Sequence, residues 1–182
     1  MFERLLALLA RELDRAGIAY MVIGGQAVQL YGEARMTQDI DITLGIGTEG
    51  LARVMDVCRA CGLNIRTNAP VELVRDTMVL PAIEEKTGIR VDFVFSLTDY
   101  ERQAIERGRL VELGGTEVRF AALEDLIIHK LVAERPRDIE DVRIILARNP
   151  GFDRAYTELW LRRFSETLSR DISSVLRRLL QA

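Results

Sequence analysis

Residues 39–44, Asp39-Ile-Asp-Ile-Thr-Leu44, alternate strictly between polar and apolar side chains. Successive side chains of a β-strand point to opposite faces, so this segment predicts a strand with one buried face and with Asp39, Asp41 and Thr43 on the other. The two aspartates lie roughly 6.5–7 Å apart at their bases, which is unfavourable for like charges unless a cation lies between them. The alternative is an ordinary polar outer face, because edge strands often display charge.

A third carboxylate lies in the same register of a later segment. Residues 90–95, Arg-Val-Asp-Phe-Val-Phe, predict a strand whose apolar face leaves Asp92 on the polar side. This strand pairs with residues 78–83 as a hairpin across the polar turn 84–88. If it also lies beside residues 39–44, three carboxylates converge, and hard cations such as magnesium require such oxygen ligands.

Two glycines precede this acidic region. Residues 19–23 predict a short buried strand, Gly24 and Gly25 follow directly, and residues 26–31 predict a short helix. Such glycines let the backbone approach a ligand closely, and a helix N-terminus offers N–H groups suited to phosphate. The alternative is a simple tight turn. The segment fits neither the dinucleotide-binding fingerprint nor a P-loop, so both of those classes are excluded.

The remaining elements complete a mixed α/β outline. Apolar residues recur at helical spacing in residues 2–16 and about 48–61, a second hairpin crosses Gly114 and Gly115, and the chain is helical from Ala122 onward with interruptions at Pro136 and Pro150. We expect a core in residues 1–121, built on a mixed β-sheet flanked by helices. A helical C-terminal region, residues 122–182, follows it.

Composition excludes several classes of protein. The 182 residues are 48% hydrophobic and 29% charged, with a net charge of −3, as in ordinary globular proteins. Residues 1–121 hold 14 basic and 18 acidic residues, and residues 122–182 hold 11 and 10, so neither part is a strongly basic nucleic-acid surface. No apolar run approaches the roughly 20 residues that span a bilayer, and charges interrupt the N-terminal segment. We expect a cytoplasmic protein with no membrane partner.

The two cysteines carry no expected chemistry. Cys58 and Cys61 fall in a run with helical apolar spacing, so we interpret them as core residues. Reactive cysteines need an exposed, electropositive setting, and a zinc site would need more soft ligands than the single histidine adds.

Lys130 is one of only two lysines and falls in the middle of the apolar stripe predicted for residues 123–134. Its ammonium either snorkels to the surface or reaches a polar cavity, and we favour the cavity, where it would meet a phosphate. Replacement by methionine would then preserve stability. The neighbouring His129 is interpreted as a boundary residue rather than a catalytic base.

Residues 135–141 open the next predicted helix. Asp138 is either its N-cap or a functional residue, and Arg135 and Arg137 are either solvated or phosphate contacts. The pattern alone leaves these alternatives open.

With these residues placed, the chain resembles the nucleotidyltransferase superfamily with a DNA polymerase β-like fold, whose signature is a Gly-Gly or Gly-Ser turn, a D-x-D strand and a third Asp. Within it the chain is most similar to the AbiEii/MenA-like toxin group, which carries an R-x-T-x-D-[IL]-D segment and a later helical Lys followed by an R-x-x-D-x-x-D-like run. The matching residues, over about 18–147, are Gly24, Gly25, Arg35, Thr37, Asp39, Asp41, Asp92, Lys130, Arg135, Asp138 and Asp141.

The resemblance implies transfer of a nucleoside monophosphate from an NTP such as ATP. Asp39, Asp41 and Asp92 would hold two Mg²⁺ ions, with Mn²⁺ as a substitute, about 3.5–4 Å apart, and Asp92 is the candidate general base. The expected substrate-binding residues are Gly24, Gly25, Gln26, Arg35, Thr37, Lys130 and Asp138. Gln26 departs from the family, because many members place Ser there to hold the triphosphate; backbone amides remain able to do so.

Three readings of function compete. The alternatives to the transferase are a catalytically inactive member acting as a binding module, and a metal-dependent hydrolase or nuclease. The acceptor would be tRNA or another RNA, a protein side chain, or a small-molecule hydroxyl such as that of an aminoglycoside. The toxin group implies an antitoxin partner. An apolar C-terminal run either packs in the monomer, which we favour, or covers a partner or a second copy in a homodimer; its residues are Trp160, Phe164, Leu168, Val175, Leu176 and Leu179.

Overall fold

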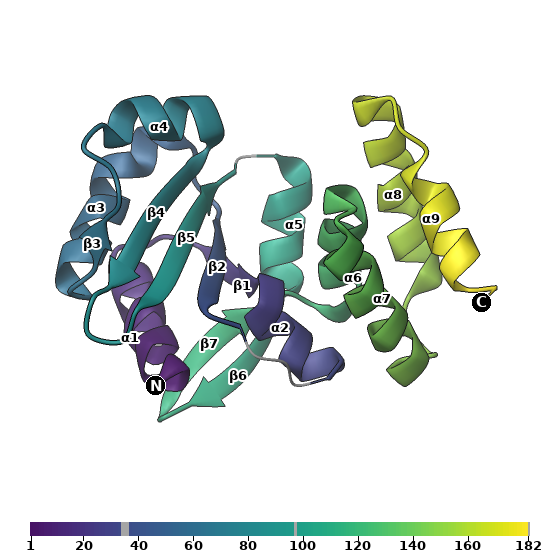
Figure 1. Ribbon diagram of the computed structural model, residues 1–182, viewed down its shortest axis with the longest axis horizontal. Coiled ribbons are helices and arrows are strands. Elements are labelled where there is room, and N and C mark those ends of the chain that lie inside the picture. Colours follow the sequence, from purple (N-terminus) through teal and green to yellow (C-terminus); the bar gives the residue numbers. More distant parts are fainter. Residues whose placement is uncertain (34–36, 97, 182) are drawn as a thin grey trace. The chain divides into compact units, whose positions relative to one another are not determined.

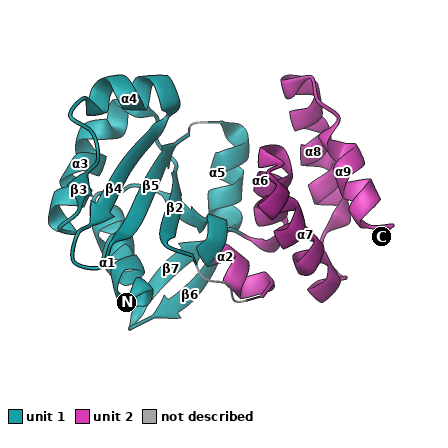
Figure 2. Cartoon of the chain, viewed as in Figure 1, with its two compact units in different colours: residues 1–26, 36–121 teal, residues 27–35, 122–182 magenta. Residues whose placement is uncertain are grey.

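The structure is a computed structural model that describes residues 1–33, 37–96 and 98–181. Its contacts divide the chain into two compact units (Figure 2). Unit 1 comprises residues 1–26 and 36–121, and unit 2 comprises residues 27–35 and 122–182. Residue 121, the expected end of the core, is also the last residue of unit 1, whereas residues 27–35 cluster with the C-terminal helices.

All strands of the described chain lie in unit 1 and form one sheet, as Figure 1 shows. They are β1 (Tyr20–Ile23), β2 (Asp39–Leu44), β3 (Asn64–Ile65), β4 (Val79–Glu84), β5 (Ile89–Phe95), β6 (Arg109–Leu113) and β7 (Thr116–Phe120). Their order is β3-β4-β5-β2-β1-β7-β6. β2 pairs antiparallel with β1 and parallel with β5, so the sheet is mixed and the expected fold class is confirmed.

The helices complete both units. Unit 1 contains α1 (Phe2–Arg15), the short 3₁₀ helix η1 (Thr48–Gly50), α3 (Leu51–Ala60), α4 (Pro70–Thr77) and α5 (Asp99–Arg107). Unit 2 contains α6 (Leu123–Ala133), α7 (Pro136–Arg148), α8 (Arg154–Leu168) and α9 (Ile172–Leu179). The helix α2 (Gly24–Tyr31) begins in unit 1, and its residues from Ala27 onward belong to unit 2.

The core of unit 1 lies under the apolar face of β2, where Ile40, Ile42 and Leu44 are fully buried. The helix α1 contacts β6, β7 and α3, and Figure 1 shows α1 and α3 behind the strands. Each large aliphatic side chain buried in this way contributes about 1.5–3 kcal/mol. The apolar face of β2 therefore packs in the core, and the opposite face, which carries Asp39 and Asp41, holds the polar side chains.

Two regions of unit 1 have structure that the sequence pattern does not indicate. The strand β3 is only two residues long, and α4 and α5 are short helices in segments to which we assign no element. Pro70 occupies the first turn of α4, and the Thr98 side chain accepts a hydrogen bond from the Glu101 N–H at the start of α5. These local signals begin helices too short to show clear periodicity.

The helices of unit 2 follow the expected interruptions. Pro136 lies in the first turn of α7, where its missing N–H costs nothing, and Pro150 lies between α7 and α8. Trp160, Val175 and Leu176 are buried, as expected for packing within the monomer, whereas Leu168 is exposed.

Two further expectations can be compared with the structure. Cys58 and Cys61 are free and buried, as expected, and burial raises the pKa of each thiol to about 12. Such thiols are inert at neutral pH. Among the described residues, no helix has the length and apolar character to cross a membrane.

Candidate active site

Four charged residues form a rectangle on one face of two neighbouring strands. In the parallel register of β2 and β5, Asp39 is the Cα partner of Arg90 and Asp41 is the partner of Asp92. Partnered residues point to the same side of a sheet, and so do residues two apart along a strand. The rectangle therefore brings together three carboxylates and one guanidinium. With all four groups ionised, it carries an excess of negative charge.

Gly24 closes one side of this rectangle. The strand β1 ends at Ile23, the Cα partner of Asp41, so the next residue lies beside the Asp41 carboxylate. A Cβ added at Gly24 would overlap the Asp41 Oδ2 and come within 2.8 Å of its Cγ. Gly24 also has a φ of +65°, which L-residues rarely adopt. Both the space and the backbone conformation require glycine here.

Gly25 is constrained by a different neighbour. A Cβ at Gly25 would lie 2.7 Å from the Thr37 Oγ1 and 2.9 Å from its Cβ, while the backbone φ is not in the left-handed region. The Thr37 hydroxyl also accepts a 3.4 Å hydrogen bond from the Asp39 N–H. The helix α2 begins at Gly24, two residues earlier than expected, so both glycines lie in its first turn. The N–H groups of a first helical turn lack intrahelical acceptors.

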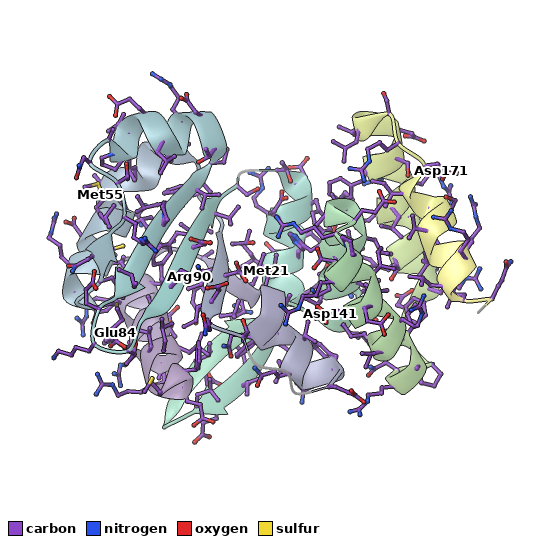
Figure 3. All side chains as sticks on the ribbon, viewed as in Figure 1. Met21, Met55, Glu84, Arg90, Asp141 and Asp171 are labelled. Atoms are coloured by element: carbon purple, nitrogen blue, oxygen red, sulfur yellow. The ribbon has the colours of Figure 1, made fainter. Side chains whose placement is uncertain are left out.

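Arg90 forms an ion pair with Asp39. The Arg90 Nε lies 2.5 Å from the Asp39 Oδ1, and both side chains remain substantially exposed. This hydrogen bond and the Asp39 charge raise the pKa of Arg90 further above its usual value. Sequence reasoning missed this residue, although its position two residues before Asp92 indicated the same face. Figure 3 marks Arg90 on β5.

Asp92 carries the perturbed carboxyl of the rectangle. Its pKa is raised, first by burial and then by the Asp39 charge, while the Arg90 and Arg66 charges act in the opposite direction. Arg66 follows β3, and its N–H donates to the carbonyl of Pro81, the Cα partner of Asp92. The sequence pattern did not indicate Arg66, because its approach depends on β3 and β4 pairing. A raised pKa is typical of a carboxyl that acts as a base.

The donor set fits a divalent cation in its chemistry, but the side chains are not gathered around one point. No group of three His, Cys, Asp or Glu side chains in the described chain stands close enough to hold a single ion. The Asp39 carboxylate is instead paired with Arg90. Asp41 and Asp92 remain register partners with oxygen ligands of the kind that Mg²⁺ prefers.

Gln26 follows the two glycines and is the last residue of unit 1. Its side chain is 7% exposed, and its Nε2 has no hydrogen-bond partner among the described residues. An unsatisfied buried donor is costly and calls for an explanation. The amide can donate two hydrogen bonds to an anion, a capacity that a serine hydroxyl at this position would only partly share.

In unit 2, Lys130 is buried between two carboxylates. Its Nζ lies 2.9 Å from the Asp138 Oδ1 and 2.7 Å from the Asp141 Oδ2, and its side chain is 5% exposed. The snorkelling alternative is therefore wrong. The polar surroundings that we favoured are present, but the partners of the ammonium here are carboxylates; contact with a phosphate stays a prediction. One oxygen of the pair, the Asp138 Oδ2, is buried without a partner in the described chain.

The capping interpretation of Asp138 is also wrong. Arg135 occupies the N-cap position of α7, and Asp138 lies within the first helical turn with its side chain turned to Lys130. His129 is half-buried on α6, in keeping with a boundary residue. Arg35, expected to bind substrate, lies outside the described residues.

Comparison with known families decides the class of protein. A family model described as a nucleotidyl transferase of unknown function (DUF2204) matches residues 2–181. The chain belongs to this family. As a DUF2204 nucleotidyl transferase it is an enzyme, which disfavours the reading of a non-catalytic binding module. No curated protein sequence matches the chain.

Solved structures show that this DUF2204 protein shares a known fold. The antibiotic-resistance factor ANT(2'')-Ia in solution is similar at TM-score 0.60 and 16% identity, over 92% of this chain and 95% of that one. ANT(2'')-Ia in complex with adenylyl-2''-tobramycin is similar at TM-score 0.59 and 17% identity, over 91% and 98%. A nucleotidyltransferase-like protein from Paracoccidioides brasiliensis is similar at TM-score 0.51 and 14% identity, over 96% and 91%. At these identities the likeness extends to the fold.

Proposed function

We propose that this protein transfers a nucleoside monophosphate from an NTP to an acceptor hydroxyl at the face formed by β2 and β5. The observation that carries the proposal is the register that places Asp41 beside Asp92, with Asp39 on the same face and Gly24 against the Asp41 carboxylate. Three acidic groups next to a glycine turn suit a metal-assisted displacement at phosphorus, in which the acceptor oxygen bonds to the α-phosphorus as the bond to the leaving pyrophosphate breaks. Family membership supports the reaction class.

Asp39, Asp41 and Asp92 are the residues that would hold Mg²⁺, or Mn²⁺ in its place. Two such ions, when bound, supply the positive charge that stabilises the attacking and leaving oxygens of a phosphoryl transfer. Asp92 is the proposed general base, because its raised pKa makes its carboxylate more basic than that of an ordinary aspartate and so better able to accept the proton of the acceptor hydroxyl. Asp41, next to Gly24, would orient the α-phosphate side of the nucleotide.

The triphosphate is proposed to bind at the start of α2. The backbone N–H groups of Gly24 and Gly25 are free of intrahelical acceptors, and the helix dipole favours negative charge at this end. The Gln26 amide supplies the donor that a serine supplies in other members. Thr37, adjoining Gly25, is a further proposed nucleotide contact of unit 1. Arg35, which lies outside the described residues, is also proposed to bind the nucleotide.

Lys130 and Asp138, which both belong to unit 2, are also proposed to bind substrate. Lys130 keeps a third ammonium hydrogen beyond its two carboxylate partners, and the Asp138 Oδ2 remains available to accept a hydrogen bond. We propose that these groups bind substrate, with the ammonium directed at phosphate.

The acceptor is proposed to be an RNA such as tRNA, a protein side chain or a small-molecule hydroxyl. The R-x-T-x-D-I-D segment supports membership of the AbiEii/MenA-like toxin group, which carries the proposal of a cytoplasmic toxin with an antitoxin partner. A homodimer is proposed only through the exposed remainder of the C-terminal run, of which Leu168 is the clearest member.

The reaction is tested with each of the four NTPs labelled at the α-phosphate and the full chain in Mg²⁺. Labelled acceptor in a mixture of total RNA, protein and aminoglycosides supports transfer, whereas labelled NMP alone indicates a hydrolase. Asp41→Asn should abolish labelling. Asp76→Asn, on the exposed side of α4, is the matched control and should label like the wild type. Equal labelling by Asp41→Asn and the wild type would contradict the proposed site.

A further inference from the structure

Arg90 places a positive charge against a carboxylate that the proposed reaction would use to hold metal. Its Nε lies 2.5 Å from the Asp39 Oδ1, and the two residues are Cα partners across β2 and β5. Nearby Asp92 also interacts electrostatically with the Arg90 guanidinium. The single cation of the rectangle is thus held by one of the three carboxylates proposed to bind metal.

A divalent cation and the Arg90 guanidinium would compete for the Asp39 carboxylate. The Asp39 Oδ1 accepts a hydrogen bond from the Arg90 Nε, and the guanidinium charge repels a cation that approaches the same carboxylate. Removing Arg90 from Asp39 would leave three carboxylates facing one another, a state that only another cation makes favourable.

The pair is weak enough to be displaced. The Arg90 and Asp39 side chains are 49% and 38% exposed, and ion pairs of that exposure contribute little net stability because water screens them. A divalent cation carries twice the charge of a guanidinium and binds carboxylate oxygen directly. Arg90 would then be displaced but would remain tethered beside the site.

We propose that Arg90 is a built-in counter-ion, which neutralises Asp39 until a divalent cation displaces it and which then turns to the anionic nucleotide. The inference rests on the proposed metal site. It assigns Arg90 two opposite effects: the guanidinium weakens binding of metal alone and strengthens binding of nucleotide once metal is present. Guanidinium groups suit the second role because they donate paired hydrogen bonds to phosphate oxygens.

The first experiment measures Mn²⁺ binding to the full chain without nucleotide, by electron paramagnetic resonance. Arg90→Gln should bind Mn²⁺ roughly threefold to tenfold more tightly than the wild type, because a competing ion pair and a neighbouring positive charge are both removed. Arg90→Lys keeps the charge and should stay close to the wild type. Arg75→Gln removes an exposed arginine of α4 and is the control for net charge.

The second experiment adds a non-hydrolysable NTP at saturating Mn²⁺. Arg90→Gln should now bind the nucleotide about fivefold more weakly than the wild type, so the two affinities move in opposite directions. In the wild type, the ¹⁵Nε resonance of Arg90, assigned by its loss in Arg90→Lys, should shift during a Mg²⁺ titration. A purely structural role for Arg90 would not produce this combination.

Equal Mn²⁺ affinity of Arg90→Gln and the wild type, with binding still lost in Asp41→Asn, would overturn the inference and leave the metal site standing. An unchanged Arg90 resonance at saturating Mg²⁺ would overturn it as well. Wild-type metal binding that Asp41→Asn does not reduce would instead contradict the proposed function.

Discussion

Gly24 and Gly25 are adjacent, yet different neighbours require them to be glycine. Gly24 combines a positive φ with contact to Asp41, whereas Gly25 is limited only by the Thr37 side chain. Backbone strain would therefore accompany a side chain at Gly24 but not at Gly25. At Gly24 a side chain would push on a proposed metal ligand.

Gly24→Ala is expected to remove metal-dependent nucleotide binding. The backbone strain of an alanine at positive φ costs about 1 kcal/mol of stability, and the added methyl group displaces the Asp41 carboxylate. Gly62→Ala is the matched control, because Gly62 has a φ of +68° and a Cβ there meets no described atom within 4 Å. Urea unfolding should show both variants folded, with Gly24→Ala losing at least as much stability as Gly62→Ala because only its methyl group meets Asp41, whereas calorimetric titration with NTP should fail only for Gly24→Ala. Nucleotide binding by a folded Gly24→Ala would show that the turn is structural.

Asp92 is expected to make stability fall as the pH rises. Its pKa is raised in the folded state by burial and by Asp39, so the native protein binds this proton more tightly than the unfolded chain does. Asp92→Asn should therefore increase the free energy of unfolding at neutral pH, and this gain should shrink as the pH falls toward the ordinary value of 3.8. Urea unfolding of the variant and the wild type between neutral pH and pH 3.8, in metal-free buffer, measures this difference in the free energy of unfolding. A loss of stability at neutral pH in Asp92→Asn would contradict the cause given for the shift.

At the scale of elements, α6 and α7 are joined by a buried ionic cluster. Lys130 on α6 meets Asp138 and Asp141 on α7, and all three side chains are largely removed from water. From the sequence, Lys130→Met was expected to preserve stability, because the stem would stay in an apolar stripe. The two carboxylates reverse that expectation.

Lys130→Met should cost about 3–5 kcal/mol of stability, since it leaves two buried carboxylates without their cation. Fluorescence of Trp160, the single tryptophan and a residue of unit 2, follows unfolding in urea. Lys86→Met replaces the other lysine, which is exposed in the turn between β4 and β5, and should leave stability unchanged. The triple variant Lys130→Met with Asp138→Asn and Asp141→Leu should recover most of the loss. If Lys130→Met is as stable as the wild type, the ion pairs of Lys130 do not stabilise the packing of α6 against α7.

At the scale of the whole molecule, ligand binding and folding are linked. A ligand present at a hundred times its dissociation constant stabilises the native state by about 2.7 kcal/mol. Mg²⁺ with a non-hydrolysable NTP should raise the free energy of unfolding by about this amount in the wild type. Asp41→Asn should show no such increase under the same concentrations. Equal stabilisation of both proteins would place nucleotide binding away from β2 and β5.

Much of unit 1 follows from local pattern in the sequence. Strict alternation in residues 39–44 and the apolar run in 90–95 predict two strands with polar residues on known faces, because side-chain direction in a strand depends only on position. The mixed fold class, the buried cysteines and the helical C-terminal region could also be predicted, because the spacing of apolar residues along a helix is likewise a property of the local sequence. The Gly-Gly turn and the D-x-D spacing also indicated a nucleotidyltransferase, through resemblance, and the family model agrees with that class.

Only the tertiary structure decided which of these residues meet. The parallel pairing of β2 with β5 joins segments some fifty residues apart, and it alone puts Asp41 beside Asp92 and Arg90 beside Asp39. Helical periodicity predicted that Lys130 lies in an apolar stripe of α6, but it could not predict which group the ammonium contacts. That depends on how α7 packs against α6, and the structure shows that the partners are the carboxylates of Asp138 and Asp141. Side-chain direction is a local property that sequence determines, whereas the identity of a charge's partner is set by long-range pairing, which the pattern of one segment does not contain.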